Sequence, residues 1–226
     1  MSIFAIADLH LSLSANKPMD IFNGWDNYVD KIKLNWEKLV KKDDSVVIAG
    51  DISWAMALEE SLADFEFINN LPGTKYILKG NHDFWWESRT KMENFFKEHN
   101  LNTLHIIHNS AAACENIAIC GTRGWFYDAE NDNKVLLREA NRLNTSIIEA
   151  EKIGLQPIVF LHYPPLFDTQ VCEEIMNVLK QHDIKKCYYG HLHGNAIKKA
   201  VIGKHYGIDF RLISCDFIGF TPVVVV

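Results

Sequence analysis

The chain of 226 residues carries 23 Lys and Arg against 29 Asp and Glu, a formal net charge of −6, and 48% of its residues are hydrophobic. This is the balance of a folded globular protein, and the acidic surplus disfavours a general nucleic-acid coat or a protein that binds anionic membranes. No apolar run approaches the ~20 residues of a membrane helix, and Asp8 and His10 interrupt an N-terminal stretch that lacks the basic leader of a signal peptide.

Short β-rich runs alternate with helical patterns along the chain. In chain order, we predict strands at Ile3–Ala7, Ser45–Ala49, Lys75–Leu78, Leu104–His108, Ile117–Cys120, Ile158–Leu161 and Lys186–Tyr189. Between them, apolar residues at helical spacing predict helices at Trp25–Val40, Leu58–Leu71, Ser88–His99, Asn133–Ile153 and Thr169–Gln181. This alternation predicts a layered α/β fold with parallel pairing in part of the sheet.

The last segment of the chain, His205–Val226, is predicted to be all-β, with Gly203 and Gly207 at turns. Its end, Val223–Val226, is predicted to be an edge strand or a dimer contact, because an uncovered strand tends to pair. No internal repeat, low-complexity stretch or linker-like change of composition divides the chain, so we expect one domain over residues 1–226.

The cysteines are scattered, five in number, and never spaced as C-x-x-C. They are Cys114, Cys120, Cys172, Cys187 and Cys215. This usage favours reduced, structural thiols over a disulfide framework or a thiolate zinc site. We therefore expect a cytoplasmic protein.

Polar side chains that bind metals follow five of the predicted strands, just beyond the last apolar residue of each. These segments are Asp8-Leu9-His10, Gly50-Asp51, Gly80-Asn81-His82-Asp83, His162 and Gly190-His191-Leu192-His193. In α/β sheets the loops that leave adjacent strand ends converge at one rim, where ligands bind. The sequence therefore predicts that these side chains meet at a single site.

Imidazole, carboxylate and amide donors without a thiolate suit Zn, Mn or Fe rather than a structural zinc finger or a calcium site. Seven such ligands are too many for one tetrahedral ion but suit two ions about 3.5–4 Å apart that share a carboxylate. On an extended chain, Asp8 and His10 face the same side, as do His191 and His193. Any one of these residues alone is more often a turn former, a helix cap or a satisfied histidine, so the prediction rests on the whole ordered set.

With these five segments in order, the sequence resembles the calcineurin-like metallophosphoesterase superfamily, whose pattern is D-x-H, G-D, G-N-H-[DE], a strand-terminal H, and G-H-x-H. The motifs span residues 8 to 193 and none is missing. Within the superfamily, Asp51-Ile52-Ser53-Trp54 and Thr122-Arg123-Gly124-Trp125 resemble a bacterial group of phosphohydrolases. The resemblance implies a four-layer αββα sandwich of two mixed β-sheets flanked by helices, with a dinuclear metal site on one rim.

Carried over position by position, the resemblance implies two groups of ligands. One metal would take Asp8, His10, Asp51 and His193, and the other would take Asp51, Asn81, His162 and His191, with Asp51 bridging. His82 would face the substrate as the catalytic residue instead of binding metal. The cofactors implied are two divalent ions, Mn, Zn or Fe.

The reaction implied is hydrolysis of a phosphomonoester or phosphodiester in one displacement, by a hydroxide that bridges the two metals. Both metals would neutralise the charge that develops on the phosphoryl oxygens. His82 would protonate or stabilise the departing oxygen, which contributes typically about 10²–10⁴-fold. The protein phosphatases of the superfamily carry G-D-x-x-D-R, whereas here Trp54 occupies the place of the second Asp. That departure disfavours phosphoprotein phosphatase activity and leaves His82 without an identified orienting partner.

Further residues near the motifs have two interpretations each. Arg123 either contacts phosphate or substrate through its guanidinium or forms an ordinary loop ion pair. Four aromatic residues beside the metal motifs either stack on a base or an apolar leaving group or pack the sheet edge; they are Trp54, Phe84, Trp85 and Trp86. Asp83 is predicted to fix its loop or a neighbouring histidine, and the histidines outside the motifs are predicted to be structural or at the surface.

A small phosphorylated substrate is the expected partner. A nuclease or nucleotide pyrophosphatase with the same centre stays an alternative, although the acidic charge disfavours long nucleic acid. A noncatalytic scaffold of the same fold is the alternative from another class, and such a scaffold would be expected to have lost ligands. We expect no membrane partner and leave a homo-oligomer open.

Overall fold

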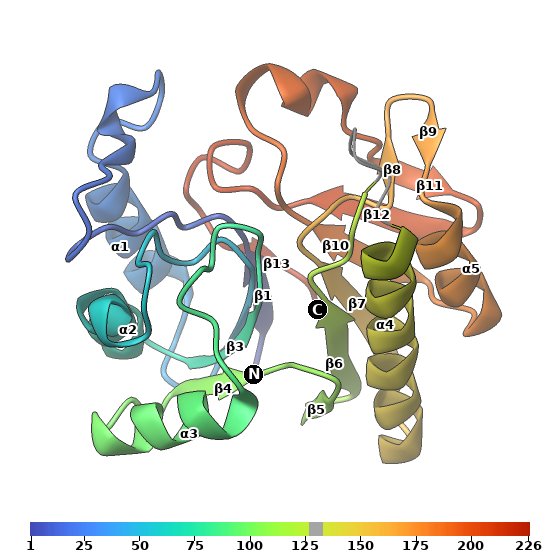
Figure 1. Ribbon diagram of the computed structural model, residues 1–226, viewed down its shortest axis with the longest axis horizontal. Coiled ribbons are helices and arrows are strands. Elements are labelled where there is room, and N and C mark those ends of the chain that lie inside the picture. The colour runs from blue at the N-terminus through green and yellow to red at the C-terminus, as the bar shows by residue number, and fades with distance from the viewer. Residues whose placement is uncertain (127–132) are drawn as a thin grey trace.

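The computed structural model describes residues 1–126 and 133–226. Two large β-sheets face each other, and helices cover the outer face of each, so that the molecule has four layers (Figure 1). This arrangement confirms the predicted αββα sandwich of two mixed sheets.

The first sheet has the strand order β13-β1-β2-β3-β4. Its strands are β1 (Ile3–Ile6), β2 (Ser45–Ala49), β3 (Thr74–Leu78), β4 (Leu104–Ile106) and β13 (Val223–Val224). β1 to β4 are parallel, and β13 pairs antiparallel with β1 at the edge, as predicted for the C-terminal segment. Helices α1 (Tyr28–Leu39), α2 (Leu62–Asn70) and α3 (Arg89–Glu98) cover its outer face, on the left in Figure 1.

The second sheet has the strand order β11-β12-β10-β7-β6-β5. Its strands are β5 (Ala111–Cys114), β6 (Ile117–Thr122), β7 (Gln156–Leu161), β10 (Lys186–Tyr189), β11 (Gly203–His205) and β12 (Ile208–Leu212). The four inner strands are parallel, and the two edge strands are antiparallel to their neighbours. Helices α4 (Asn133–Ile153) and α5 (Glu173–Gln181) cover its outer face.

Three short 3-10 helices and a hairpin complete the described residues. The 3-10 helices are η1 (Met19–Ile21), η2 (Glu59–Ser61) and η3 (Gly194–Lys199), and the hairpin consists of β8 (Leu166–Phe167) and β9 (Gln170–Val171). Among the helices of the described residues, none has both the length and the apolar composition of a bilayer-crossing segment. All five cysteines are buried and free, as their spacing predicts.

The alternation of side chains along each strand builds three apolar layers. In β1, Phe4 and Ile6 pack towards the helices of the first half, whereas Ile3 and Ala5 face the second sheet. Strands β6, β7 and β10 alternate in the same way between the α4 and α5 helices and the first sheet. Because both faces of the inner strands are buried, these strands are continuously apolar in sequence.

The two sheets meet at the rim where the parallel strands end. The backbone amide of Ala7 donates to Ile213 O at 2.9 Å, and the amide of Cys215 donates to Ala7 O at 3.1 Å. These bonds join the end of β1 to the loop after β12. The residue after Ala7, Asp8, therefore lies at the junction of the two sheets.

Three segments differ from the sequence prediction. The helix predicted at Thr169–Gln181 begins only at Glu173, because the preceding residues form the β8-β9 hairpin, which turns at Asp168 (φ 54°). The tail is not all-β, since residues 213 to 222 form loops. Strand β5 was not predicted, because an alanine-rich run lacks the β-branched and aromatic residues typical of strands.

Candidate metal centre

The predicted metal-binding residues converge on the rim described above. They follow β1, β2, β3, β7 and β10, and they comprise Asp8, His10, Asp51, Asn81, His162, His191 and His193. Six of the seven, all except Asn81, form two groups in which the donor atoms lie within 4.8 Å of one another. The structure therefore brings together residues that are distant in the sequence, since Asp8 and His193 are 185 positions apart.

The first group consists of Asp8, His10 and His193. The Nε2 atoms of His10 and His193 face each other at 3.4 Å, and His193 Nε2 lies 3.6 Å from Asp8 Oδ1. Three donor atoms from two different sheets thus point at one position.

The second group consists of Asp51, His162 and His191. Asn81 completes it, because its Oδ1 lies 2.6 Å from His162 Nε2 and 2.9 Å from His191 Nδ1. Asp51 lies between the two groups: its Oδ2 is 3.4 Å from His162 Nε2 and 3.7 Å from His10 Nε2. A carboxylate in this place is positioned to be shared by two cations.

Close backbone packing explains the glycines that precede the donor residues. A Cβ atom on Gly80 would lie 2.1 Å from both Asp51 N and Asp51 Oδ1, and one on Gly190 would lie 2.6 Å from Asp8 Oδ2. Neither position has room for a side chain. These glycines let the loops bring Asp51 and Asp8 to the rim.

The loops reach the rim through left-handed backbone conformations at non-glycine residues. Asp8 (φ 61°), His10 (φ 46°), Asp51 (φ 49°) and His191 (φ 72°) all have positive φ. The D-x-H pair therefore meets in one group, but by a turn of the backbone and not by the extended-strand alternation that we predicted. The H-x-H pair is divided, with His193 in the first group and His191 in the second. Such conformations cost free energy and persist at functional sites where the surroundings fix them.

Polar groups behind the donors fix their orientation. His193 Nδ1 lies 2.9 Å from Asp216 Oδ1, and His162 Nδ1 lies 3.2 Å from Ala49 O. The backbone amide of His191 donates to Asp8 Oδ2 at 2.9 Å. Such supports orient a metal-binding imidazole through its second nitrogen and raise its basicity.

Asp83 fixes the loops that carry Asp51 and Asn81, as predicted. Its buried carboxylate accepts hydrogen bonds from the backbone amides of Asp51 (3.0 Å), Ile52 (2.8 Å) and Gly80 (2.6 Å). Trp85 Nε1 donates to the same carboxylate at 3.1 Å. Burial, together with the charge of Asp51, raises the pKa of Asp83 to about 7. Asp83 therefore ties the β2 and β3 loops together without facing the donor groups.

Three of the four imidazoles are neutral at pH 7. Burial lowers the pKa of His10 to about 3 and that of His191 to about 3, and it also lowers the pKa of the fully buried His162. A neutral imidazole has a free lone pair and is the form that binds a metal.

The carboxylates and His193 behave differently. Burial and the charge of Asp8 raise the pKa of Asp51. Burial alone would raise the pKa of Asp8, but His193 outweighs it and holds that pKa below the usual range. Burial alone would lower the pKa of His193, yet Asp8 and Asp216 raise it to about 10. Protons on Asp51 and His193 thus partly balance the buried negative charge.

The donor set fits two cations. Within the described residues, neither Asp8 nor Asp51 has a Lys or Arg as an ion-pair partner, although both carboxylates are buried. Buried carboxylates need a positive partner, and apart from His193 the converging imidazoles favour the neutral form, which offers lone pairs and no charge. Nitrogen and oxygen donors in two linked groups supply what two divalent ions require.

His82 lies at the edge of the first group and packs against Trp54. The two rings are 4.5 Å apart, and Trp54 also stacks on His10 at 4.9 Å and 20°. Within residues 1–126 and 133–226, no side chain forms a hydrogen bond with the His82 imidazole. The imidazole packs instead against Trp54, the residue that occupies the place of the second Asp of G-D-x-x-D-R. Burial lowers the pKa of His82.

The four aromatic residues beside the motifs divide between the two interpretations. Trp85 is buried in the core, where its ring packs 4.8 Å from Phe65, and Trp86 packs against it at 5.3 Å. Trp54 and the exposed Phe84 both lie beside His82, with ring centroids at 4.5 and 6.1 Å from the imidazole. Only Trp54 and Phe84 are therefore placed to form an aromatic wall at the site.

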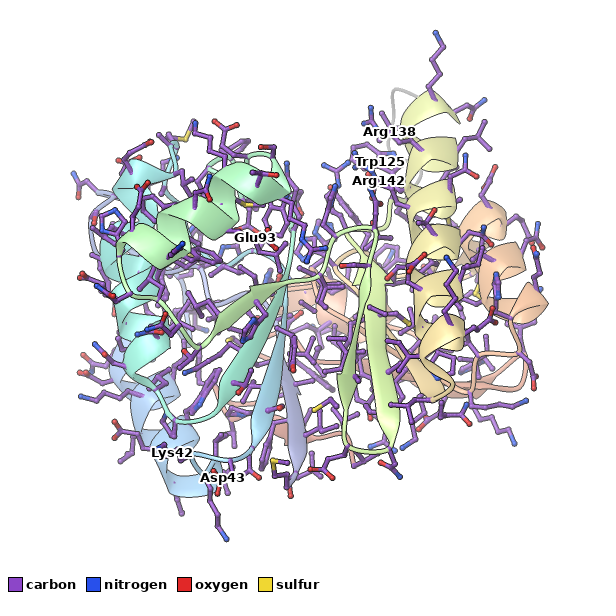
Figure 2. The ribbon with its side chains drawn as sticks, turned by 90° about the horizontal axis from the view of Figure 1, so that it is seen from below. Lys42, Asp43, Glu93, Trp125, Arg138 and Arg142 are labelled. Atoms are coloured by element: carbon purple, nitrogen blue, oxygen red, sulfur yellow. The ribbon has the colours of Figure 1, made fainter. Side chains whose placement is uncertain are left out.

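Arg123 lies in the loop after β6 and faces the second sheet's helix. Its Nη2 is 3.6 Å from Oε1 of the buried Glu139, and its guanidinium lies 4.7 Å from the Trp125 ring. Trp125 and Arg142, which also pairs with Glu139 at 2.7 Å, lie on the α4 side of the molecule (Figure 2). This is the geometry of a loop ion pair, and contact with phosphate stays a prediction.

Sequence reasoning missed three residues at the centre. Asp216 supports His193, the Trp25 ring lies 5.6 Å from that of His193, and the Tyr163 ring lies 4.2 Å from that of His191. Asp216 follows Leu212, the last residue of β12, by four positions, so the end of a sixth strand was the available signal. No comparable sequence signal indicates that Trp25 and Tyr163 lie at the centre.

Comparison with known proteins agrees with this geometry. A family model described as calcineurin-like phosphoesterase matches residues 1–195. Among curated protein sequences, none shows significant similarity to this chain.

Solved structures share the fold at low sequence identity. A protein of unknown function from Aquifex aeolicus is 14% identical with a TM-score of 0.55, covering 99% of this chain and 95% of that one. The phosphopantetheinyl hydrolase of Mycobacterium tuberculosis is 15% identical with a TM-score of 0.51, covering 94% and 88%. A protein of Thermus thermophilus is 14% identical with a TM-score of 0.51, covering 99% and 87%.

At these identities the solved structures show the fold alone. The match of the family model is the stronger result, because it extends over residues 1–195 of 226 and includes every donor residue of the centre. The chain belongs to the calcineurin-like phosphoesterase family.

Proposed function

We propose that this chain is a dinuclear metal-dependent phosphoesterase that hydrolyses a small phosphate ester. Its family supports metal-dependent phosphohydrolase activity in general. The observation that carries the finer proposal is the position of Asp51, whose carboxylate lies between two groups of donors, 3.4 Å from His162 Nε2 and 3.7 Å from His10 Nε2.

The seven donors divide between two cations. Asp8, His10, Asp51 and His193 would hold one, and Asp51, Asn81, His162 and His191 would hold the other. Two such ions, when bound, acidify water and neutralise charge on phosphoryl oxygens. We propose Mn, Zn or Fe, because imidazole and carboxylate donors without thiolate suit these metals.

The charge of the donor set favours a phosphate ester. Asp8 and Asp51 are the only acids among the seven donors, so they contribute two negative charges against the four positive charges of two divalent ions. The balance is positive and is confined to one rim of an acidic chain. A local positive centre attracts a single phosphate group without making the whole surface basic.

His82 is the residue we propose to act on the ester. Its ring lies 5.8 Å from that of His10, outside both donor groups, and Trp54 packs on it. From this edge the imidazole is placed to give a hydrogen bond or a proton to the oxygen that leaves phosphorus. General acid catalysis of this kind contributes about 10²–10⁴-fold to the rate.

The test combines metal content with hydrolysis. The purified protein, loaded in turn with Mn, Zn, Fe, Co or Mg, is assayed against a panel of phosphomonoesters and phosphodiesters. We expect two equivalents of metal per chain and hydrolysis with at least one metal. Asp51→Asn should reduce turnover more than about 10³-fold, because it removes the carboxylate shared by both groups.

The matched control is Asp43→Asn, the same change at an exposed acid in the loop between α1 and β2, far from the rim (Figure 2). It should leave metal content and turnover unchanged. Bound metal without hydrolysis under every metal would contradict the proposal and support the noncatalytic scaffold.

A further inference from the structure

Two pockets border the candidate metal centre on different sides. The first pocket has a volume of about 410 Å³, and its lining includes His10, His82, His193, Trp25, Trp54 and Phe22. The second pocket has a volume of about 260 Å³, and its lining includes His191, Trp125, Phe126, Tyr163, Phe167 and Leu192. Donor residues of the first group thus lie in one pocket wall, and a donor of the second group lies in the other.

Apart from His191, the second pocket is lined by aromatic and aliphatic residues. The first pocket combines the aromatic rings of Phe22, Trp25 and Trp54 with three histidines and the polar residues Asn23 and Asp216. Neither lining contains a Lys or an Arg.

Two basic groups lie beside lining residues of the second pocket, and each is paired with an acid. The Arg123 guanidinium is 4.7 Å from the Trp125 ring and 3.6 Å from Glu139, and Lys199 Nζ is 6.0 Å from the Phe167 ring and 3.3 Å from Asp168. Beside the first pocket, Lys17 Nζ is 5.4 Å from the Trp54 ring. Each pocket therefore suits an uncharged organic group.

The sizes of the pockets agree with this interpretation. Sites that enclose a whole drug-sized ligand usually measure about 300–1,000 Å³, and these two pockets measure about 410 and 260 Å³. The second pocket lies below this range and the first lies near its lower end, so each has room for a substituent about the size of an aromatic ring. Together they flank the place where the two donor groups would hold a phosphate.

A phosphomonoester and a phosphodiester place different groups on the two sides of phosphorus. A monoester has one organic substituent and an additional charged oxygen, whereas a diester has two organic substituents. Turning a charged oxygen towards an apolar wall without a cation is costly, whereas burying an organic group there is favourable. Only the diester uses both pockets.

We propose that the centre takes a phosphodiester with an apolar or aromatic group on each of its two ester oxygens. The leaving group occupies the first pocket, because His82 lies in its wall, and the retained group occupies the second pocket. This inference rests on the proposed function. In the reaction, the oxygen of water bonds to phosphorus, the P–O bond to the group in the first pocket breaks, and the departing oxygen takes a proton, giving an alcohol or phenol and a phosphomonoester.

The experiment compares two diesters of equal charge and with the same leaving group, bis(p-nitrophenyl) phosphate and methyl p-nitrophenyl phosphate. They differ only in the retained group, which is a ring in the first and a methyl group in the second. Trp125→Ala removes an aromatic wall of the second pocket. It should lower kcat/KM for the bis ester about 10-fold and leave the methyl ester nearly unchanged, so that the ratio of the two falls.

Phe167→Ala, on the opposite element β8, should lower the same ratio and guards against a folding defect in one variant. The matched control is Tyr206→Ala, which removes an exposed aromatic ring that lines neither pocket. Its ratio should equal that of the unmodified protein. Because the ratio is compared between variants, the different intrinsic reactivity of the two esters cancels.

The outcomes separate this inference from the proposed function. If the metal-loaded protein hydrolyses these esters but the ratio is the same in all variants, or if p-nitrophenyl phosphate is the better substrate, the diester inference is wrong and the phosphoesterase stands. If none of the three esters is hydrolysed with any metal, the proposed function fails and this inference fails with it.

Discussion

The two donor groups of the candidate centre differ in how they are enclosed. In the second group, His162 is fully buried, and Ala49 O and Asn81 hold its two ring nitrogens. In the first group, the His193 side chain is 29% exposed, and the loop residue Asp216 supports it. The most buried imidazole therefore belongs to the second group, although each group also places one half-buried histidine in a pocket wall, His193 in the first pocket and His191 in the second.

The difference lies in the supports, because the donors of both groups leave inner strands of the two sheets. In the second group, His162 is supported by the carbonyl of Ala49, the last residue of β2. In the first group, His193 is supported by Asp216, which lies in the loop between β12 and β13. We expect the first group to be more sensitive to substitutions in its supports and the second to be more sensitive to substitutions in the core.

Outside the two donor groups, the largest effect is expected for His82. His82→Ala should retain both metals and lower turnover by about 10²–10⁴-fold, because the group that acts on the leaving oxygen is lost while the donors are intact. Metal analysis and steady-state kinetics on the same preparation check this. His105→Ala, at an exposed histidine of β4, is the control. Loss of a metal in the His82 variant would instead assign His82 to the first group.

A smaller effect is expected for the support of the first group. Asp216→Asn removes the charge beside His193 Nδ1, which lies 2.9 Å from Asp216 Oδ1. Loss of such a support typically costs about 10–100-fold in metal affinity. Titration calorimetry should show one of two binding events weakened and the other unchanged, while Asp209→Asn, an acid of β12 paired with Arg211 at the surface, changes neither. Equal weakening of both events would show that the two groups are not independent.

The sequence predicted the donor set because each donor stands next to a strong local signal. An apolar strand followed by Gly and a polar residue is visible for Asp51, Asn81 and His191 without any knowledge of the fold. Parallel strands then bring their ends to one rim, so local patterns were enough to predict a long-range cluster. The αββα layers followed from the same patterns together with the family resemblance.

The features of the site that were not predicted depend on contacts between segments that are distant in the sequence. Asp216 lies in a segment predicted to be all-β, so the loop that places it behind His193 was not predicted. The packing of Trp54 against His82 joins two loops, and only the fold sets the 4.5 Å between the two rings. The left-handed backbone at Asp8 and His10 is likewise imposed by the junction of the two sheets and not by residue type.

Substitution of Arg123 tests whether turnover requires a side chain from the loop beside the second group. The backbone carbonyl of Arg123 accepts hydrogen bonds from the amides of His162 (3.2 Å) and Tyr163 (2.9 Å), and any residue at this position provides that carbonyl. Arg123→Met should therefore change turnover by less than about threefold. Its stability should fall by no more than about 1 kcal/mol, because Glu139 keeps Arg142 at 2.7 Å and Thr122 Oγ1 at 2.7 Å. A loss of turnover comparable to that of His82→Ala, with an unchanged thermal midpoint, would show that the guanidinium contacts the substrate, and the second side of the centre would then carry a cation.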